Sequence, residues 1–470
     1  MTLATTLILA GTQAWAAPGN LDTSFGKAND GTPDGVVNLS FGNGNEGANA
    51  AVLQKDGKLV VAGYSSSTGG KSSNIIILRL NKDGSLDPSF GVGQEDNSPD
   101  GVVSIDLGDS ADVAAAIALQ TDGKILIAGN RRSKTSDIVL ARLMPNGKLD
   151  STFGKGDADG TPDGVVSISL SDGDDVANAL AVQKDGKIVV AGTTVATDKT
   201  TNIAVARLKA DGTLDTTFGK GDSDGTPDGV VSVSLSEGSD TANALALQTD
   251  GKIVVAGTAT AKDKSTNIAV ARLKADGTLD PTFGVGTSDG TPDGVVAVSL
   301  SQGNDAAKAV AIHRSQIYVA GEYVAADGST NVAVARLKSD GSLDPAFGRD
   351  ASDNTPDGVS GVSFGNGNDH VHALAIQSDG ALLVLAGTTS AADKSANIAV
   401  ARMKSDGTLD KRFGAGESDG TPEGVVGLSL GAGDDVAKAV VLQSDGKIVV
   451  VGDRVNGSSS DIVVVRILGK

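Results

Sequence analysis

The side chains with the clearest capacity for chemistry are acids that recur at one position along the chain. Each stands eight residues before the Gln, or its equivalent, that ends a short run rich in Ala and Leu. The seven acids are Glu46, Asp112, Asp175, Asp240, Asp305, Asp369 and Asp435. If these runs surround a common axis, seven carboxylates would ring one mouth of it, where bound Ca²⁺ would relieve their mutual repulsion. The alternative is that each acid accepts hydrogen bonds from backbone N–H groups of its own turn, and both interpretations stay open.

Acidic loops form a second candidate calcium site. The acids are Asp157, Asp159 and Asp163 in one loop and Asp222, Asp224 and Asp228 in the corresponding loop of the next unit. Asp alternating with Gly allows several oxygens to converge on a hard cation, but the bidentate Glu that completes an EF-hand loop is missing. The pattern therefore fits either a calcium loop or a set of solvated turns.

Groups typical of catalysis are few. Cysteine is absent, which excludes thiolate chemistry, and only three histidines occur. His370 and His372 would share one side of a strand beside Asp369, where they would begin a metal site, but such a site normally needs four ligands. A surface pair or a pair that lines the axis is the alternative. The G-x-S-x-G match at Ser363 occupies an ordinary repeat position with no helix after it, so we interpret it as coincidence.

An Arg recurs in the third apolar run of every unit. These residues are Arg79, Arg142, Arg207, Arg272, Arg336, Arg402 and Arg466. Wherever the chain continues, the Asp of a Leu-Asp-x-x-Phe-Gly motif follows eight residues later. Because the guanidinium fork can bind a carboxylate in bidentate fashion, this spacing predicts a structural ion pair within or between units. The Phe of the motif is expected to pack between units.

All these residues belong to seven copies of one unit. The Leu-Asp-x-x-Phe-Gly motif begins at Leu21, Leu86, Leu149, Leu214, Leu279, Leu343 and Leu409, 63 to 66 residues apart. Each unit has four short runs rich in β-branched residues, separated by Gly-containing turns. The pattern predicts an all-β chain of four-stranded units, a seven-bladed β-propeller. The turns at residues 313–316 and 381–383 depart from the pattern, which leaves the regularity of blades five and six open.

The phase of the repeat predicts how the ring closes. The first unit opens with an outer-strand run at residues 36–41, whereas the last unit ends after its third run at 462–468. The spare N-terminal strand would therefore become the outermost strand of the last blade, outside the runs at 437–443, 447–452 and 462–468. A linear solenoid is the alternative, but it would need atypical capping units.

The motifs LDxxFG, DGKIVVAG and ARLxxDGxLD together resemble those of a known family. With seven spaced copies between Leu21 and Lys470, the chain resembles the delta-60 repeat proteins, a bacterial family of β-propellers. The resemblance implies a propeller fold and export, and it implies no particular activity.

Composition and charge limit the partners. A net charge of -19 repels nucleic acid and anionic membrane surfaces, and 3% aromatic residues leave few platforms for stacking. No run beyond the first residues is long enough to span a bilayer. Residues 1–17 are expected to be a signal peptide, because an apolar run precedes the small-residue site Ala14-Trp15-Ala16. Residues 18–470 would then form the propeller.

Two functions compete. The first is a secreted, periplasmic or cell-surface scaffold, expected to be monomeric, that binds an unknown protein or cell-surface ligand and uses Ca²⁺ for stability. The second is a metal-dependent propeller enzyme, lactonase-like or lyase-like, with its site at the mouth of the axis. An enzyme site should break the symmetry of the ring, and most of this chain is repetitive. The sequence therefore favours the scaffold.

Overall fold

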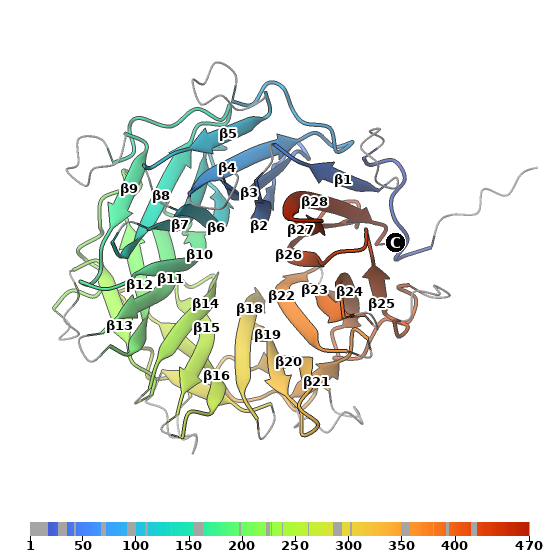
Figure 1. Cartoon of the computed structure of the whole chain (residues 1–470). Helices are drawn as coiled ribbons and strands as arrows, with labels where there is room; N and C mark the ends of the chain where they lie inside the picture. Colours follow the sequence, from blue (N-terminus) through green and yellow to red (C-terminus); the bar gives the residue numbers. More distant parts are fainter. Residues whose placement is uncertain are drawn as a thin grey trace, which may run out of the picture.

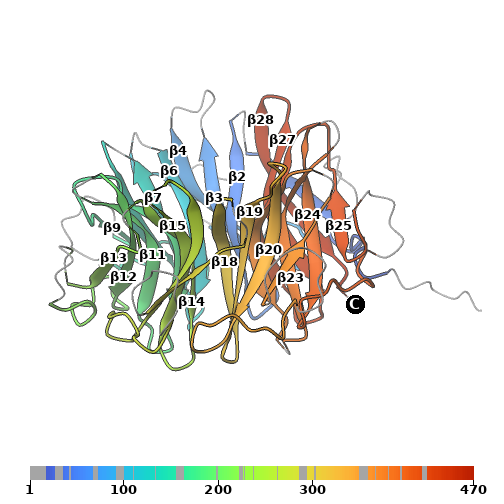
Figure 2. The ribbon, with the colours of Figure 1, turned by 90° about the horizontal axis from the view of Figure 1, so that it is seen from below.

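Seven four-stranded blades surround one axis in the computed structural model (Figure 1). The structure describes residues 17–469, apart from 27–34, 42–43, 67–71, 92–99, 109–110, 133, 155–162, 197–198, 222–225, 227, 237, 262, 285–293, 301–302, 349–357, 366, 379, 392–393 and 415–420. From the side, the blades stand next to one another as a short cylinder (Figure 2). Nowhere in these ranges does a helix have the length and hydropathy of a membrane span. The predicted all-β, seven-bladed propeller is confirmed.

The strands occupy equivalent places in each blade. The innermost are β2 (Glu46–Leu53), β6 (Ala111–Leu119), β10 (Val176–Val182), β14 (Asp240–Leu247), β18 (Asp305–His313), β22 (Asp369–Ile376) and β26 (Asp435–Leu442). The second are β3 (Leu59–Ser66), β7 (Ile125–Arg132), β11 (Ile188–Val195), β15 (Ile253–Thr260), β19 (Gln316–Val324), β23 (Leu382–Ser390) and β27 (Ile448–Asn456). The third are β4 (Ser73–Leu80), β8 (Ser136–Leu143), β12 (Thr201–Leu208), β16 (Thr266–Leu273), β20 (Thr330–Leu337), β24 (Ala396–Lys404) and β28 (Ser459–Ile467). The outermost are β5 (Val102–Ile105), β9 (Val165–Ile168), β13 (Val230–Val233), β17 (Val295–Val298), β21 (Val359–Val362), β25 (Val425–Leu428) and β1 (Val36–Leu39). Neighbouring strands within a blade are antiparallel.

The last blade is closed by the first strand, as the repeat phase predicts. β1 pairs with β28 in antiparallel register from Val36 opposite Val465 to Leu39 opposite Ile462. β1 covers the outer edge of β28, which would otherwise expose unpaired backbone groups. The ring is therefore held shut by contacts between the two ends of the chain.

Seven apolar clusters, one between each pair of adjacent blades, form the core. Between blades 3 and 4, for example, Val189 and Val205 pack against Val255 and Ala271. Both faces of every blade are therefore covered. This explains why the second and third strands read as continuous apolar runs rather than as alternating ones.

Every innermost strand contains a β-bulge at the same position. In β14 the pairing with β15 shifts between Ala242 and Ala244, which leaves Asn243 unpaired. The Gly of each second strand lies beside this bulge. At Gly257 an added Cβ would lie 1.7 Å from the backbone oxygen of Thr241, so the position has no room for any side chain. The bulge is thus part of the repeat, and it turns one side chain per blade out of the regular pairing.

Candidate functional site

The seven recurring acids lie at the start of the innermost strands, within one residue of the first strand position, and all are buried, with exposures of 0–1%. Asp240 Oδ2 accepts a hydrogen bond of 2.6 Å from the backbone N–H of Leu235, five residues earlier. The same bond occurs at Asp112, Asp175, Asp305, Asp369 and Asp435. A cation bound at these carboxylates would face the same backbone N–H groups, whose positive ends would repel it. The geometry therefore favours the turn-capping interpretation.

Calcium binding by the acids stays a prediction. In the described ranges no three His, Asp or Glu side chains come together in a group that would hold a metal ion. Of the loop acids, Asp157, Asp159, Asp222 and Asp224 lie outside the described residues. Asp163 and Asp228 are described, and Asp228 Oδ1 accepts a hydrogen bond of 3.4 Å from the backbone of Gly221.

The third-strand Arg residues join each blade to the next, which confirms the predicted ion pairs. In blade 4, Arg272 Nε lies 2.8 Å from Asp280, its Nη1 donates to the backbone oxygen of Ser339 in blade 5, and its guanidinium lies 4.5 Å from the ring centroid of Phe283. We call this set a latch. In chain order of the Arg residues, the carbonyl acceptors are Pro145, Ala210, Ala275, Ser339, Ser405, Gly469 and Lys82.

The last latch crosses the ends of the chain. Arg466 pairs with Asp22 at 2.7 Å and stacks on Phe25, both from the first Leu-Asp-x-x-Phe-Gly motif of the chain. Its Nη1 donates to the carbonyl of Lys82 in blade 1. The N-terminal motif thus supplies the Asp and the Phe that contact the C-terminal Arg466.

A Lys from the turn between the first two strands supports most latches. Lys252 Nζ lies 3.1 Å from Asp280. Burial by itself would raise the pKa of Asp280, but hydrogen bonds from Thr282 and the charges of Lys252 and Arg272 outweigh it and hold that pKa well below its usual range. The carboxylate therefore stays ionised across the physiological range.

Blades 5 and 6 lack the turn Lys, and other side chains reach the latch Asp, from the turn in blade 5 and from the Leu-Asp-x-x-Phe-Gly motif itself in blade 6. Gln316 Nε2 donates to Asp344 at 3.2 Å in blade 5, and Arg412 Nε lies 2.9 Å from Asp410 in blade 6. Both blades have the regular strand order. The departing turns therefore leave the strand order of these two blades unchanged.

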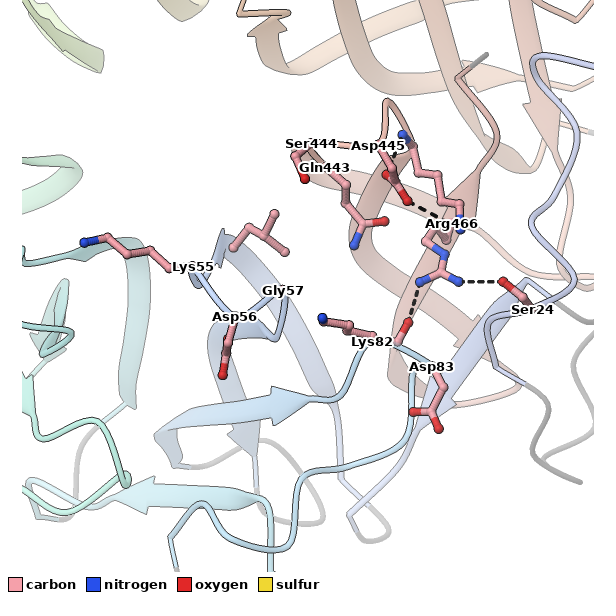
Figure 3. A pocket seen from close by; sticks show the side chains of 12 residues that line it. Ser24, Lys55, Asp56, Gly57, Lys82, Asp83, Gln443, Ser444, Asp445 and Arg466 are labelled. Atoms are coloured by element: carbon pink, nitrogen blue, oxygen red, sulfur yellow. Dashed lines mark hydrogen bonds and ion pairs between the residues drawn. The ribbon is translucent and has the colours of Figure 1, made fainter.

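Pockets open between blades at the end of the ring that carries these turns. One of about 440 Å³ lies between blades 7 and 1, where Arg466 is held between Ser24 and the backbone of Lys82 (Figure 3). Pockets of about 520 and 400 Å³ occupy the corresponding places between blades 3 and 4 and between blades 4 and 5. Each borders a latch Arg whose hydrogen bonds are already used. We attribute these pockets to the repeated packing of turns.

The G-x-S-x-G serine behaves as a repeat residue. Ser363 Oγ donates to the backbone oxygen of Gly365 at 2.7 Å, and Ser169 and Ser234 make the same bond two residues along in their own blades. With its hydroxyl used in a turn and a strand rather than a helix nearby, Ser363 has no feature of a nucleophile elbow.

The side chain at the bulge position differs in chemical type between the blades. The seven bulge residues are Asn49, Ala115, Asn178, Asn243, Lys308, His372 and Lys438. In blades 1, 3 and 4 the Asn side chain donates to a backbone oxygen of the next innermost strand, as Asn243 does to Ala307 at 2.7 Å. In blades 5, 6 and 7 this neutral link is replaced by basic side chains on three adjacent strands, β18, β22 and β26 (Figure 1).

Acidic residues accompany the basic ones. The residue after the second-strand Gly is Tyr64, Asn130, Thr193, Thr258, Glu322, Thr388 or Asp453. The only acids in this series, Glu322 and Asp453, occur in the two blades whose bulge residue is Lys. We call Lys308, Glu322, His370, His372, Lys438 and Asp453 the axial cluster.

Contacts across blades tie part of the axial cluster together. Glu322 is 13% exposed and lies 3.5 Å from Lys308 of its own blade and 3.3 Å from His370 Nδ1 of the next blade. Burial, together with the charges of Lys438 and Lys308, lowers the pKa of His372 to about 3. His372 is therefore neutral at pH 7, between two ammonium groups.

Asp453 is the acid of blade 7, and burial raises its pKa to about 6 although the N–H of Ala48 donates to it at 2.9 Å. In the unfolded chain its pKa would be about 3.9. The folded state thus keeps a proton between pH 4 and 6 that the unfolded chain releases, so stability falls as the pH rises through this window.

We expect Asp453→Asn to be more stable than the wild type at pH 8, by up to about 3 kcal/mol, and equally stable at pH 4, because Asn keeps the acceptor oxygen without ionising. Urea unfolding at pH 4, 6 and 8 measures this. Asp263→Asn, in an exposed hairpin turn, is the control and should gain nothing at pH 8. Equal differences at pH 4 and pH 8 would contradict the assignment.

The sequence identified only part of this site. The sequence indicated His370 and His372 beside Asp369. However, Asp369 accepts a hydrogen bond from the backbone N–H of Phe364 at the start of its own strand, and His370 faces Glu322. The residues missed are Lys308, Glu322, Lys438 and Asp453. Aligning the seven units at the Asn that follows the inner-strand acid by three residues would have shown the change to Lys, His and Lys.

Solved structures with a similar fold are distant in sequence. A catalytically inactive virginiamycin B lyase from Staphylococcus aureus with quinupristin matches at 10% identity and a TM-score of 0.44, covering 92% of this chain and 98% of that one. The WD40 β-propeller domain of Doa1 matches at 11% identity and 0.43, covering 92% and 97%. Semaphorin 2a from Drosophila matches at 10% identity and 0.46, covering 92% and 76%.

No curated protein matches the sequence. A family model described as a domain of unknown function (DUF5122) beta-propeller matches seven times, at residues 54–90, 120–153, 183–218, 248–283, 316–347, 377–413 and 443–468. Each match except the fifth includes the whole Asp-Gly-Lys turn or its substitute, and each except the last ends at the Phe of the Leu-Asp-x-x-Phe-Gly motif. The chain therefore belongs to the DUF5122 β-propeller family.

Proposed function

We propose that this protein is exported and acts as a rigid binding scaffold that recognises a ligand at the axial cluster. The observation that carries the proposal is the change at the bulge position. Blades 1, 3 and 4 use it to link neighbouring strands, whereas blades 5, 6 and 7 place Lys308, His372 and Lys438 there. A local departure from symmetry on adjacent strands is the expected mark of a ligand site on a repetitive frame.

The latches support the scaffold half of the proposal. The repeated Arg, Asp and Phe side chains are buried and bonded between blades, so they hold the frame and are not free to bind a ligand. In the described ranges no group of His, Asp or Glu side chains favours the metal-dependent enzyme. The ligand is an unknown protein or cell-surface molecule, and we expect the scaffold to be a monomer.

Ligand-induced stabilisation tests the binding half. A panel of sugars, organic acids, amino acids and phosphates is screened for compounds that raise the melting temperature, because a ligand that binds only the folded state stabilises it. A ligand of the axial cluster should stabilise the wild type and not the Lys308→Asn, Lys438→Asn double variant. Lys264→Asn removes an exposed Lys from a hairpin turn and serves as the charge control. Equal stabilisation of all three proteins would contradict the assignment of the site.

Export is tested separately. The N-terminus of the mature protein in the cell envelope or medium should lie near Ala17. Recovery of an intact N-terminus from the cytoplasm alone would contradict export and leave the site assignment standing.

A further inference from the structure

The charges of the axial cluster define what kind of ligand it can hold, and this inference rests on the proposed function that the cluster is a ligand site. The cluster contains two ammonium groups, Lys308 and Lys438, and two acids, Glu322 and Asp453. It therefore has little net charge at pH 7, so a multiply charged anion would find no matching excess of cations.

The two ammonium groups are not equivalent. Lys308 lies 3.5 Å from Glu322, whose other oxygen lies 3.3 Å from His370. Lys438 makes no hydrogen bond or ion pair with any residue that the structure describes, although its charge acts on both His372 and Asp453. One carboxylate oxygen of Asp453 accepts a hydrogen bond from the backbone N–H of Ala48. One cation of the cluster is therefore available to a ligand.

His372 supplies the second contact. It occupies the bulge of the neighbouring strand β22, is half-buried, and makes no hydrogen bond within the described part of the chain. A neutral imidazole carries one N–H donor, which complements an oxyanion without adding charge. An ammonium and an imidazole N–H on adjacent strands match the two oxygens of one carboxylate.

We propose that the axial cluster binds a small organic acid through a single carboxylate, which Lys438 and His372 contact. The bulge side chains on the other side of the axis, among them Asn178 and Asn243, are polar and uncharged. The rest of the ligand would therefore face polar groups without charge. The blade-interface pockets take no part.

The chain offers its own matched variant. Lys438→Asn installs the residue that three sister blades carry at this bulge, where it donates to the next innermost strand. The variant should therefore fold with a urea midpoint at or above that of the wild type. Lys308→Asn should have a smaller effect on binding, because Lys308 is already paired.

The test follows the imidazole resonances of the three histidines by NMR at pH 7, with His372 identified by its loss in His372→Asn. Acetate and glucuronate, added separately, should shift the His372 resonance saturably, whereas glucose should not and inorganic phosphate should bind more weakly. Lys438→Asn should weaken acetate binding at least tenfold, and Lys264→Asn should bind as the wild type does.

Each contrary result has a distinct meaning. If glucose or phosphate shifts His372 and the carboxylates do not, the carboxylate assignment is overturned while the cluster stands as a ligand site. Acetate binding unchanged by Lys438→Asn would overturn the role of Lys438. If none of the four compounds shifts His372 or His370, the carboxylate assignment fails, and a compound from the thermal panel that stabilises the wild type but not the double variant would still support the proposed function.

Discussion

A chain that starts at Asn45 should fail to form the native ring at 25 °C. It lacks β1, and with it Asp22 and Phe25, the partners of Arg466. Removing one partner of a buried ion pair costs about 3–5 kcal/mol. Each lost buried side chain, including Val36 at 0% exposure, costs about 1.5–3 kcal/mol more. Together these losses are comparable with the whole stability of a typical domain.

Circular dichroism and urea unfolding of this chain, beside a control chain that starts at Ala17, measure the effect. A synthetic peptide of residues 17–41, added in excess, should restore the native signal, because β1 is held on β28 by non-covalent contacts and not by a direct chain connection. Unfolding of the Asn45 chain at the same urea concentration as the control would contradict the role given to β1.

Arg272→Ala should destabilise the protein by about 3–5 kcal/mol. The substitution removes the bonds to Asp280 and to Ser339 of the next blade, and it uncovers Phe283. Lys252 remains 3.1 Å from Asp280 and offsets part of the loss, which places the expected value at the lower end. Arg272→Lys keeps the charge but lacks the planar fork, so it should fall between Ala and the wild type.

Urea midpoints of the Arg272 variants measure the latch, with Lys274→Ala, whose side chain is 43% exposed, as the control expected to change stability by less than about 0.5 kcal/mol. Arg466→Ala should be more damaging than Arg272→Ala, since its partner Asp22 lies 444 residues away and the pair crosses the non-covalent seam of the ring. Arg272→Ala within about 0.5 kcal/mol of the wild type would show that the latch contributes nothing.

The repeat made much of this fold predictable. Seven copies fixed the number of blades, and the phase of the copies identified β1 as the outer strand of the last blade. The spacing of eight residues between Arg and Asp predicted the ion pairs, because both groups lie in the same short stretch of chain. The bond from Arg272 to Ser339 joins residues 67 apart, and it depends on how one blade is rotated against the next. No local pattern contains that rotation.

The site was harder to predict because a bulge is needed to create it. An alternating run of small residues indicates a regular strand, and nothing in the sequence around Asn243 indicates that the chain carries an extra residue there. The bulge follows from the Gly on the neighbouring strand, whose backbone passes too close for a side chain. Lys308, His372 and Lys438 also come from three separate units, so only the ring brings them together.

Hydrogen exchange with and without glucuronate shows where on the ring the carboxylate ligand binds. We predict slowed exchange in the inner strands of blades 5, 6 and 7, at residues 305–313, 369–376 and 435–442, and unchanged exchange at the turns that line the pocket between blades 7 and 1. Slowed exchange at those turns, at residues 53–58 and 443–447, or no change anywhere, would contradict this prediction.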